Sequence, residues 1–302
     1  MDQERRQQVK ADLALLFVAF IWGATFVVVD DALSGIGPFY FLALRFFIAF
    51  LFLALVCRRQ FRYANWETMK AGVLIGLFLF GGYGFQTVGL KYTGPATAAF
   101  ITGFAVVLVP VFSSFLAKKL PGLFVTVGVI SATAGLALLT LRGGISNLNY
   151  GDLLVFFCAI CFSGHIVAVG RYAREHNPVV LAMTQIATVS LLSLIIALGT
   201  ESFPAWFTRP VWVGLIICSI PATSVAFLIQ NSVQRYSTPS HTAIIFTMEP
   251  VFGLLMAYLL AREMLSVQQV LGSLLILAGM LVAEFQTPPR ETRGFSSSHP
   301  VR

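Results

Sequence analysis

The chain has 302 residues, 57% of them hydrophobic and 11% charged, with a formal net charge of +7 and a mean hydropathy of +0.83. A soluble domain carries roughly twice that charged fraction, so the composition excludes a soluble globular protein and indicates a polytopic α-helical membrane protein. The basic balance does not predict nucleic-acid binding, because the Lys and Arg residues lie in short loops and not in a patch with stacking aromatic residues.

Ten apolar stretches are long enough to cross a bilayer, which requires ~20 mostly apolar residues. They lie near residues 13–30, 38–56, 71–90, 96–116, 123–141, 152–170, 178–198, 211–231, 240–260 and 267–285. The first stretch continues through Trp22 to Val29 without a small-residue cleavage site, which favours an uncleaved span over a signal peptide. The expected fold class is all-α, with ten transmembrane helices.

The basic residues sort by side of the membrane. Most of the 20 Lys and Arg residues fall at the two termini and in the even-numbered loops between spans. The opposite loops hold Lys91, Arg142, Arg209 and Arg262. By the positive-inside rule we expect a multi-pass protein of the plasma (cell inner) membrane with both termini in the cytoplasm.

The chain contains a long internal repeat. Asp12 and Pro38 match Asp152 and Pro178 at an offset of 140, and Gln86, Lys91, Tyr92 and Pro95 match Gln230, Arg235, Tyr236 and Pro239 at an offset of 144. We therefore expect five-helix repeats over residues 10–141 and 150–285, followed by a disordered cytoplasmic tail over 286–302. Because five is odd, the second copy would enter the membrane inverted, as in secondary transporters with a site near the midplane. A duplicated membrane scaffold or receptor is the alternative.

Several short motifs resemble the ten-span EamA-type members of the drug/metabolite transporter superfamily. They are Trp22-Gly23, Ala43-Leu44-Arg45-Phe46, Ala99 to Gly103 with Val109-Pro110, Glu249-Pro250-Val251-Phe252, Arg262-Glu263 and Leu277-Ala278-Gly279. The resemblance implies a central cavity lined mainly by spans 1, 3, 4, 6, 8 and 9, and export of small metabolites such as amino acids. The chain departs from the family at Lys118-Lys119-Leu120-Pro121, where a Gly-Glu-Arg-like turn is usual.

Glu249 is the first candidate for chemistry, because it lies near the centre of span nine and immediately before Pro250. A charge at that depth costs at least ~2.5–3.5 kcal/mol. Desolvation favours the protonated form, which predicts an acid that couples transport to protons or binds a substrate ammonium group. The alternative is a structural Glu that caps the backbone opened by Pro250.

Arg45 lies about two turns into span two, roughly 10 Å from the outer surface. Arginine remains charged, so it requires an acid, backbone carbonyls or water. Glu249 is one possible partner, and Asp30 or Asp31 at the end of span one is another. The alternative is structural pairing that never contacts substrate.

Gln86 and Gln230 are repeat counterparts near the ends of spans three and eight, with Tyr92 and Tyr236 just beyond them. Because the two spans end on opposite sides, these residues are gate candidates at the two mouths of a path. Ordinary interfacial residues are the alternative.

Residues that break helices also recur in both halves. Gly81 and Gly82 in span three correspond to the region of Pro221 in span eight, and Pro110 corresponds to Pro250. Interrupted spans in matching places point to a binding site, although glycine also serves close helix packing.

Four further side chains are candidate substrate contacts. His165 and Thr25 are repeat counterparts, and Trp22 and Tyr83 lie within spans, where they would form an aromatic wall. Packing against a backbone carbonyl is the alternative for His165, and plain packing is the alternative for Trp22. Cys158, Cys161 and His165 have metal-ligand chemistry at helical spacing. Three ligands from one straight helix rarely converge on one ion, so we expect neither a metal site nor another cofactor.

These features predict a secondary transporter that exports amino acids or related metabolites by alternating access. The expected partners are a small-molecule substrate, the lipid bilayer and protons as coupling ion, with no nucleic acid, in a monomer or homodimer. The alternative is a multidrug pump for cationic compounds, with Glu249, Trp22 and Tyr83 around the cation. A membrane enzyme is not expected, because the sequence has no GxSxG or HExxH motif and no paired intramembrane aspartates.

Overall fold

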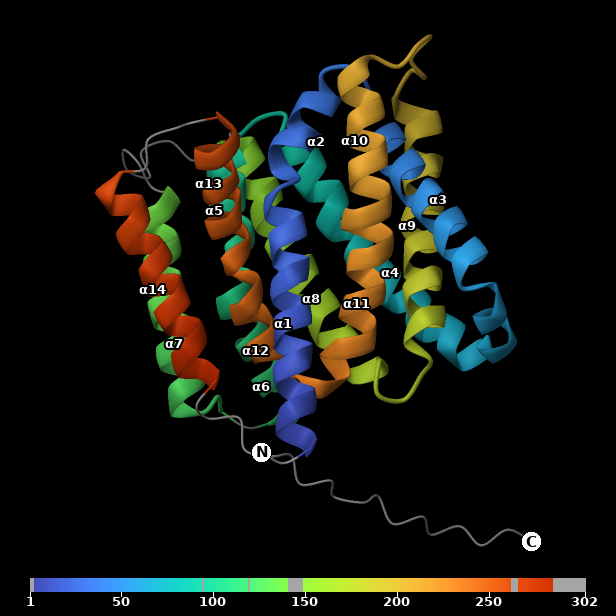
Figure 1. Ribbon diagram of the computed structural model, residues 1–302. Helices are drawn as coiled ribbons and strands as arrows, with labels where there is room; N and C mark the ends of the chain where they lie inside the picture. Colours follow the sequence, from blue (N-terminus) through green and yellow to red (C-terminus); the bar gives the residue numbers. More distant parts are fainter. Residues whose placement is uncertain (1–2, 94, 119, 141–148, 262–265, 285–302) are drawn as a thin grey trace, which may run out of the picture.

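The computed structural model describes residues 3–93, 95–118, 120–140, 149–261 and 266–284, and the described residues form helices without any strand (Figure 1). The predicted tail over 286–302 lies outside the described residues. The first half contains α1 (Gln3–Gly23), α2 (Phe26–Leu33), α3 (Pro38–Val56), the short 3₁₀ helix η1 (Arg58–Tyr63), α4 (Trp66–Gly89), α5 (Pro95–Gly103), α6 (Ala105–Ala117) and α7 (Leu123–Thr140).

The second half follows the same plan. It contains α8 (Tyr150–Tyr172), α9 (Pro178–Thr200), α10 (Arg209–Ser219), the π-helical turn η2 (Ile220–Val225), α11 (Ala226–Val233), the 3₁₀ turn η3 (Gln234–Tyr236), α12 (Pro239–Phe246), α13 (Met248–Ala261) and α14 (Val267–Glu284). Each predicted span therefore corresponds to one helix or to consecutive helices joined end to end.

The all-α membrane class is confirmed. Six of the described helical segments are long and apolar enough to cross a membrane: 5–33, 38–56, 66–89, 150–172, 178–200 and 209–236. Three shorter apolar helices cover 101–117, 123–138 and 267–282. Length and composition thus support six spans clearly, which is fewer than the ten predicted.

Polar caps mark where several helices begin. Asn65 Oδ1 accepts a hydrogen bond from the Thr68 N–H at the start of α4, and Thr238 Oγ1 accepts one from the His241 N–H at the start of α12. Asn149 and Asp152 form a reciprocal capping box at the start of α8. These side chains satisfy backbone donors that the first turn of a helix leaves unpaired.

Three helical rods are broken near their middles, and threonine stabilises two of the breaks. Between α1 and α2, Thr25 Oγ1 donates to the Trp22 carbonyl at 2.7 Å. Between α12 and α13, Thr247 Oγ1 donates to the Ile244 carbonyl at 2.6 Å. Such local side-chain bonds compete with the regular helical ladder. The third break, at Phe104, separates α5 from α6.

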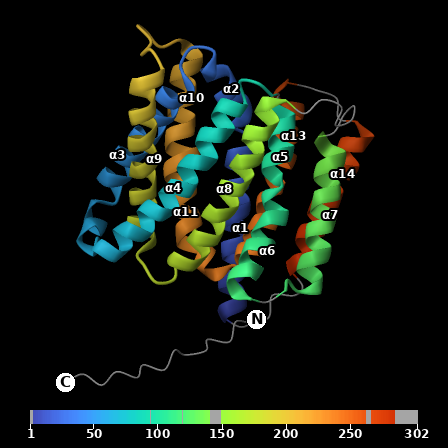
Figure 2. The same cartoon turned by 180° about the vertical axis from the view of Figure 1, so that it is seen from behind.

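The helices pack as two layers with paired helices at both ends (Figures 1 and 2). The α7–α14 pair closes one end of the molecule, and α3 and α9 pack together at the other. In Figure 1, α1 and the α10–α11 rod lie in front, whereas Figure 2 brings α4 and α8 to the front. The central space between these layers contains the candidate site.

Counterpart residues of the repeat meet between α7 and α14. A Cβ on Gly135 would lie 2.5 Å from the Gly272 carbonyl oxygen, and a Cβ on Gly279 would lie 2.7 Å from the Gly128 carbonyl oxygen. Gly279 lies 144 residues after Gly135, and Gly272 lies 144 residues after Gly128. The Gly135–Gly272 contact and the Gly279–Gly128 contact are therefore equivalent under the repeat. Helices α7 and α14 run antiparallel to each other.

Candidate functional site

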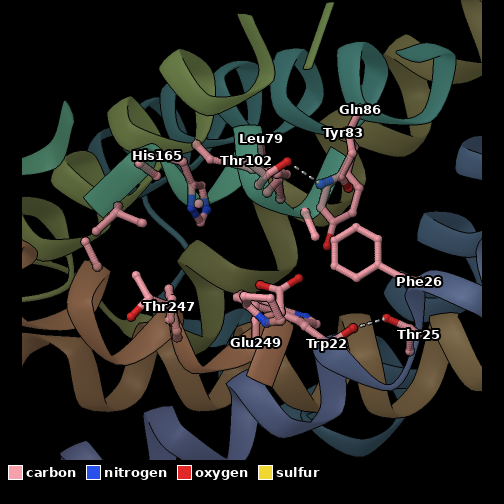
Figure 3. Close-up of a pocket in the computed structure, with 18 of the residues that line it drawn as sticks. Trp22, Thr25, Phe26, Leu79, Tyr83, Gln86, Thr102, His165, Thr247 and Glu249 are labelled. Carbon is pink, nitrogen blue, oxygen red and sulfur yellow. Dashed lines mark hydrogen bonds between the residues drawn. The ribbon is translucent and has the colours of Figure 1, made fainter. Parts of the chain in front are cut away.

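A cavity of about 100 Å³ lies between the two layers, where side chains from both halves converge (Figure 3). At roughly 10–15 Å³ per water, this is room for several waters or one small solute. Its lining comes from α1 to α6, α8, α11, α12 and α13. All three helix breaks contribute to the wall, through Thr25, Gly103 and Thr247.

Glu249 projects its carboxylate into this cavity from the first turn of α13 (Figure 3). Pro250 follows it, and the break at Thr247 precedes it, so the acid lies where the rod changes direction. No described side chain or backbone group hydrogen-bonds to its carboxylate. Gly23 lies against the Glu249 carbonyl oxygen, and a Cβ at this position would collide with it. Close approach of α1 and α13 therefore fixes the backbone beneath the acid.

Arg45 contributes a positive charge to the cavity lining. It is 3% exposed, and its Nε donates to Thr223 Oγ1 at 2.8 Å while Nη2 donates to Tyr83 Oη at 3.3 Å. The guanidinium carbon lies 4.7 Å from the centre of the Tyr83 ring, within cation–π range. Among the described residues, no ion pair joins Arg45 to Glu249, Asp30 or Asp31, so a hydroxyl and a phenol take the place of the three acids considered from the sequence.

The π-helical turn explains why a hydroxyl is available there. Pro221 interrupts the regular ladder between α10 and α11, and Thr223 Oγ1 donates to the Cys218 carbonyl at 2.7 Å. The same oxygen then accepts from Arg45. The turn also leaves the Ala222 carbonyl to accept a hydrogen bond from Trp22 Nε1 at 2.8 Å. Thus the predicted break at Pro221 positions both Arg45 and Trp22.

Aromatic rings line the cavity together with the acid and the cation. Tyr83 packs edge-to-face on Phe162 with ring centroids 5.3 Å apart, and Trp22 lies 5.5 Å from Phe227. Figure 3 shows Phe26 beside Tyr83, with Trp22 next to Glu249. The cavity thus presents one carboxylate and one guanidinium on a surface of aromatic and aliphatic side chains.

His165 lines the same cavity, and its ring contacts the side chain of Gln185. Its Nε2 lies 2.7 Å from Gln185 Oε1, and both residues are buried. Gln185 occupies the repeat position of Arg45, as His165 occupies that of Thr25. Thr25 also lines the cavity, but its hydroxyl is used to stabilise the α1–α2 break.

The gate candidates divide into two groups. Gln86 and Gln230 both line the cavity; Gln86 Nε2 donates to Thr102 Oγ1 at 3.3 Å, and Gln230 Nε2 donates to Gln234 Oε1 at 3.0 Å. Tyr92 and Tyr236 do not belong to the lining. Tyr92 packs on Tyr150, and Tyr236 accepts a hydrogen bond from Arg235.

The cysteines and His165 contact different helices. Cys158 Sγ lies 3.9 Å from Thr102 Oγ1 on α5, Cys161 packs against Gly81 on α4, and His165 contacts Gln185 on α9. Their side chains therefore diverge rather than surround one point. Among the described residues, no cluster of three metal-ligating side chains is present.

The glycines of span three differ from the expected helix break. Helix α4 is continuous through Gly81 and Gly82, where a Cβ would collide with Cys161 and Phe162 of α8. Close packing of α4 on α8 is their role here. Pro110 lies inside α6, and the chain instead breaks at Phe104, ahead of it.

Sequence reasoning missed three residues that shape the site. Thr223, Phe162 and Phe227 contact the charged or aromatic groups above. Only Thr223 had a local signal, since it lies two residues after Pro221. The two phenylalanines are indistinguishable in sequence from the many that face lipid.

Comparison with known proteins gives consistent similarity across the chain. The EamA-like transporter family matches residues 9–141 and again residues 149–284. A protein of Archaeoglobus fulgidus named as an uncharacterized transporter is 37% identical over 93% of this chain and 87% of its own. The transporter YoaV of Bacillus subtilis, also named as uncharacterized, is 24% identical over 92% and 97%. One crystal structure shares the fold with a TM-score of 0.77 at 21% identity, covering 92% of this chain and 97% of the other.

Proposed function

The chain belongs to the EamA-like transporter family and is a multi-pass membrane transporter, and from this premise we propose that it exports small zwitterionic metabolites, amino acids or related compounds. The observation that carries the proposal is the charge pattern of the cavity. Arg45 and Glu249 are its only Arg, Lys, Asp or Glu residues among those described, and they approach from different halves of the chain. A guanidinium suits a substrate carboxylate, and a carboxylate suits an ammonium group.

We propose alternating access between two inverted halves as the mechanism. The equivalent contacts of Gly135 and Gly279 between α7 and α14 support a two-fold relationship between the two halves. The breaks at Thr25 and Thr247 lie beside the cavity, and in the proposed mechanism the helices bend there as the halves rock. Secondary transporters with inverted repeats bind substrate at such a junction.

The plasma membrane, with both termini in the cytoplasm, is the proposed setting. The positive-inside distribution supports this orientation. Val29 of α2 and Leu90 after α4 line the cavity, and α2 lies at the end of the molecule opposite the N-terminus (Figure 1). This arrangement corresponds to a site that faces away from the cytoplasm.

Glu249 is the proposed coupling acid. An ionised carboxylate without a hydrogen-bond partner is unfavourable in a bilayer, so either a proton or a substrate cation is expected to neutralise it. Binding the two in alternation would couple substrate export to proton entry.

A pump for lipophilic cations is the second candidate. The rings of Trp22, Tyr83 and Phe26 around Glu249 favour it, because aromatic faces attract cations (Figure 3). The buried Arg45 guanidinium opposes it, since a cation in the same cavity would be repelled.

Purified protein in liposomes would distinguish these possibilities. We expect uptake of labelled neutral amino acids that responds to an imposed pH gradient, loss of that response in Glu249→Gln, and weak binding in Arg45→Gln with partial recovery in Arg45→Lys. Transport of lipophilic cations, undiminished in Arg45→Gln and with no amino-acid flux, would favour the second candidate. Absence of any flux with both substrate classes would contradict the proposed function.

A further inference from the structure

A surface groove lies outside the cavity, where η1 meets the start of α9. Its volume is about 480 Å³, and its lining consists of Val56, Cys57, Arg58, Arg59, Gln60, Val179 and Leu228. These residues come from the end of α3, from η1, from the first turn of α9 and from α11. The groove shares no lining residue with the cavity, although Leu228 directly follows Phe227 of the cavity wall.

The lining combines an apolar surface with two positive charges. Val56 is 64% exposed, and Val179 and Leu228 are partly buried against the hydrophobic core. Arg58 and Arg59 are exposed. In the described part of the chain, neither guanidinium takes part in an ion pair, a hydrogen bond or a cation–π contact. The groove therefore offers an apolar wall beside two cations that have no protein partner.

The surroundings of the groove are those of a membrane–water interface. Helix α3, which is long and apolar enough to cross a membrane, ends at the groove, on the side of the molecule where the N-terminus lies (Figure 1). Phe61, Tyr63 and Trp66 follow and are 47%, 46% and 70% exposed. Arg62 lies over the Tyr63 ring at 4.7 Å, and Lys70 lies 5.7 Å from the Trp66 ring. Tyr and Trp are enriched at the level of the lipid headgroups, so the groove opens where headgroups meet acyl chains.

The local balance of charge favours an anion. Between residues 58 and 70 the chain carries Arg58, Arg59, Arg62 and Lys70 against one acid, Glu67, which pairs with Lys70 at 2.7 Å. Basic clusters next to a membrane span attract anionic lipids. Guanidinium groups also bind phosphate through two parallel hydrogen bonds. A phosphate group is therefore the ligand that the two free guanidinium groups fit.

Hydrogen bonds fix the shape of the groove. Gln60 Oε1 accepts from Asn177 Nδ2 at 3.1 Å, which ties η1 to the start of α9. Asn177 Oδ1 in turn accepts from the N–H groups of Val179 and Val180 at 3.0 Å and 3.2 Å. Because these bonds hold η1 against α9, the arginines and the apolar wall are arranged without a ligand, which lowers the cost of binding one.

The repeat counterpart of the apolar wall is filled. Phe39 precedes Val179 by 140 residues, and Gly84 precedes Leu228 by 144. A Cβ on Gly84 would lie 3.7 Å from Phe39 Cε1, so the phenylalanine ring covers the glycine. In the second half, the smaller Val179 and the larger Leu228 leave a groove instead.

The two arginines also have no charged counterpart. Leu198 and Gly199 occupy the positions that match Arg58 and Arg59. At that end Glu201 carries the opposite charge, and its carboxylate accepts hydrogen bonds of 2.9 Å from two N–H groups at the start of α3. The groove is therefore a feature of one end of the molecule and does not follow from the repeat.

We propose that the groove binds one anionic phospholipid from the leaflet on the N-terminal side, with its phosphate on the guanidinium groups of Arg58 and Arg59. An acyl chain lies along Val56, Val179 and Leu228. A soluble anion would contact the arginines and leave the apolar wall exposed, whereas a lipid covers both. The inference goes beyond the proposed function, because it needs neither a substrate nor a transport cycle.

Cys57 lines the groove and is partly exposed, so a bound lipid should shield its thiol. Cys161 would be replaced by serine, whereas Cys158 and Cys218 are buried. The full-length protein would be placed in nanodiscs of phosphatidylcholine with an increasing fraction of phosphatidylglycerol. The rate of labelling by an uncharged, water-soluble maleimide would be measured in each. We expect phosphatidylglycerol to slow labelling and inorganic phosphate, added to discs of phosphatidylcholine alone, to leave it unchanged.

The test variant is Arg58→Gln with Arg59→Gln, and both side chains are exposed, so the fold should be retained. Losing two membrane-proximal arginines should lower the affinity for phosphatidylglycerol ~30-fold and remove the protection. The matched control is Arg5→Gln with Arg6→Gln, which makes the same change of charge on α1 at the same end. This control should keep the protection.

A second variant tests the acyl chain without changing charge. Val179→Phe introduces the ring that the counterpart Phe39 carries, and it should fill the groove. We expect the ratio of labelling rates without and with phosphatidylglycerol to fall to about one, since a filled groove has no room for the chain.

Unchanged protection in Arg58→Gln with Arg59→Gln, or in Val179→Phe, would overturn the proposal. Equal loss of protection in the Arg5 and Arg6 control would also overturn it, because the effect would then belong to overall charge. Protection by inorganic phosphate alone would identify a site for soluble anions and contradict the lipid. The measurement contains no transported substrate, so its outcome is independent of the amino-acid transport assay.

Discussion

Arg45 Nε donates a hydrogen bond of 2.8 Å to Thr223 Oγ1, across 178 residues of sequence and between the two halves of the chain. The same hydroxyl donates to the Cys218 carbonyl that the π-helical turn leaves free. An irregular turn in one half thereby orients the only guanidinium that the described residues place in the cavity.

Replacing Thr223 by Val should weaken substrate binding while leaving the fold intact. Valine keeps the shape but removes the acceptor, and a hydrogen bond to a charged group contributes about 1.5–3 kcal/mol, so the apparent KM for an amino acid should rise ~10-fold or more. Thr223→Ser retains the hydroxyl and should behave like the parent. An unchanged KM in Thr223→Val, beside a raised one in Arg45→Lys, would show that Arg45 needs no support from Thr223.

Gly23→Ala should destabilise the protein and impair transport together. The added Cβ would collide with the Glu249 carbonyl oxygen, forcing α1 from α13 at the level of the acid. Overpacking of this kind costs about 1–3 kcal/mol. Thermal unfolding in detergent would be compared with Gly199→Ala, where nothing lies within 4 Å of the new Cβ. Equal melting temperatures for the two variants would contradict the close approach.

Gly135→Ala and Gly279→Ala should lower the melting temperature by similar amounts. Each new Cβ would meet a backbone carbonyl of the facing helix, at 2.5 Å and 2.7 Å. Because the surroundings are repeat counterparts, the costs should match within the ~1 kcal/mol spread of such substitutions. If one variant is tolerated and the other unfolds, the two-fold relationship between α7 and α14 does not extend to their energetics.

Gln234→Leu should loosen the packing of η3 against α8. It removes the donor to the Ile166 carbonyl and the acceptor for Gln230, leaving buried polar groups unpaired at a cost of about 1–3 kcal/mol. Hydrogen exchange of the backbone between η3 and α12 should accelerate accordingly. Gln86→Leu, whose amide contacts Thr102 across the cavity, serves as the control. Faster exchange of that segment in both variants would point to global destabilisation.

The sequence alone determined the membrane class, the repeat and several local features. Composition and mean hydropathy are sums over residues. They therefore indicate a membrane protein without any information on which residues are in contact. The helix break near Pro250 and the irregular turn at Pro221 were predictable, because proline lacks the N–H that the helix requires. Glu249 was singled out by its depth in an apolar stretch and by Pro250 after it, and the structure places it in the cavity lining.

Only the tertiary structure decided which groups meet. Arg45 was expected to contact an acid, backbone carbonyls or water, and its hydrogen-bond partners are the hydroxyls of Thr223 and Tyr83. Gly81 and Gly82 suggested a break, yet α4 is continuous through them. They allow Cys161 and Phe162 of α8 to pack closely against α4. Hydrogen-bond partners and close approaches are set by the rotation and depth of helices far apart along the chain, whereas periodicity and composition report only on each helix by itself.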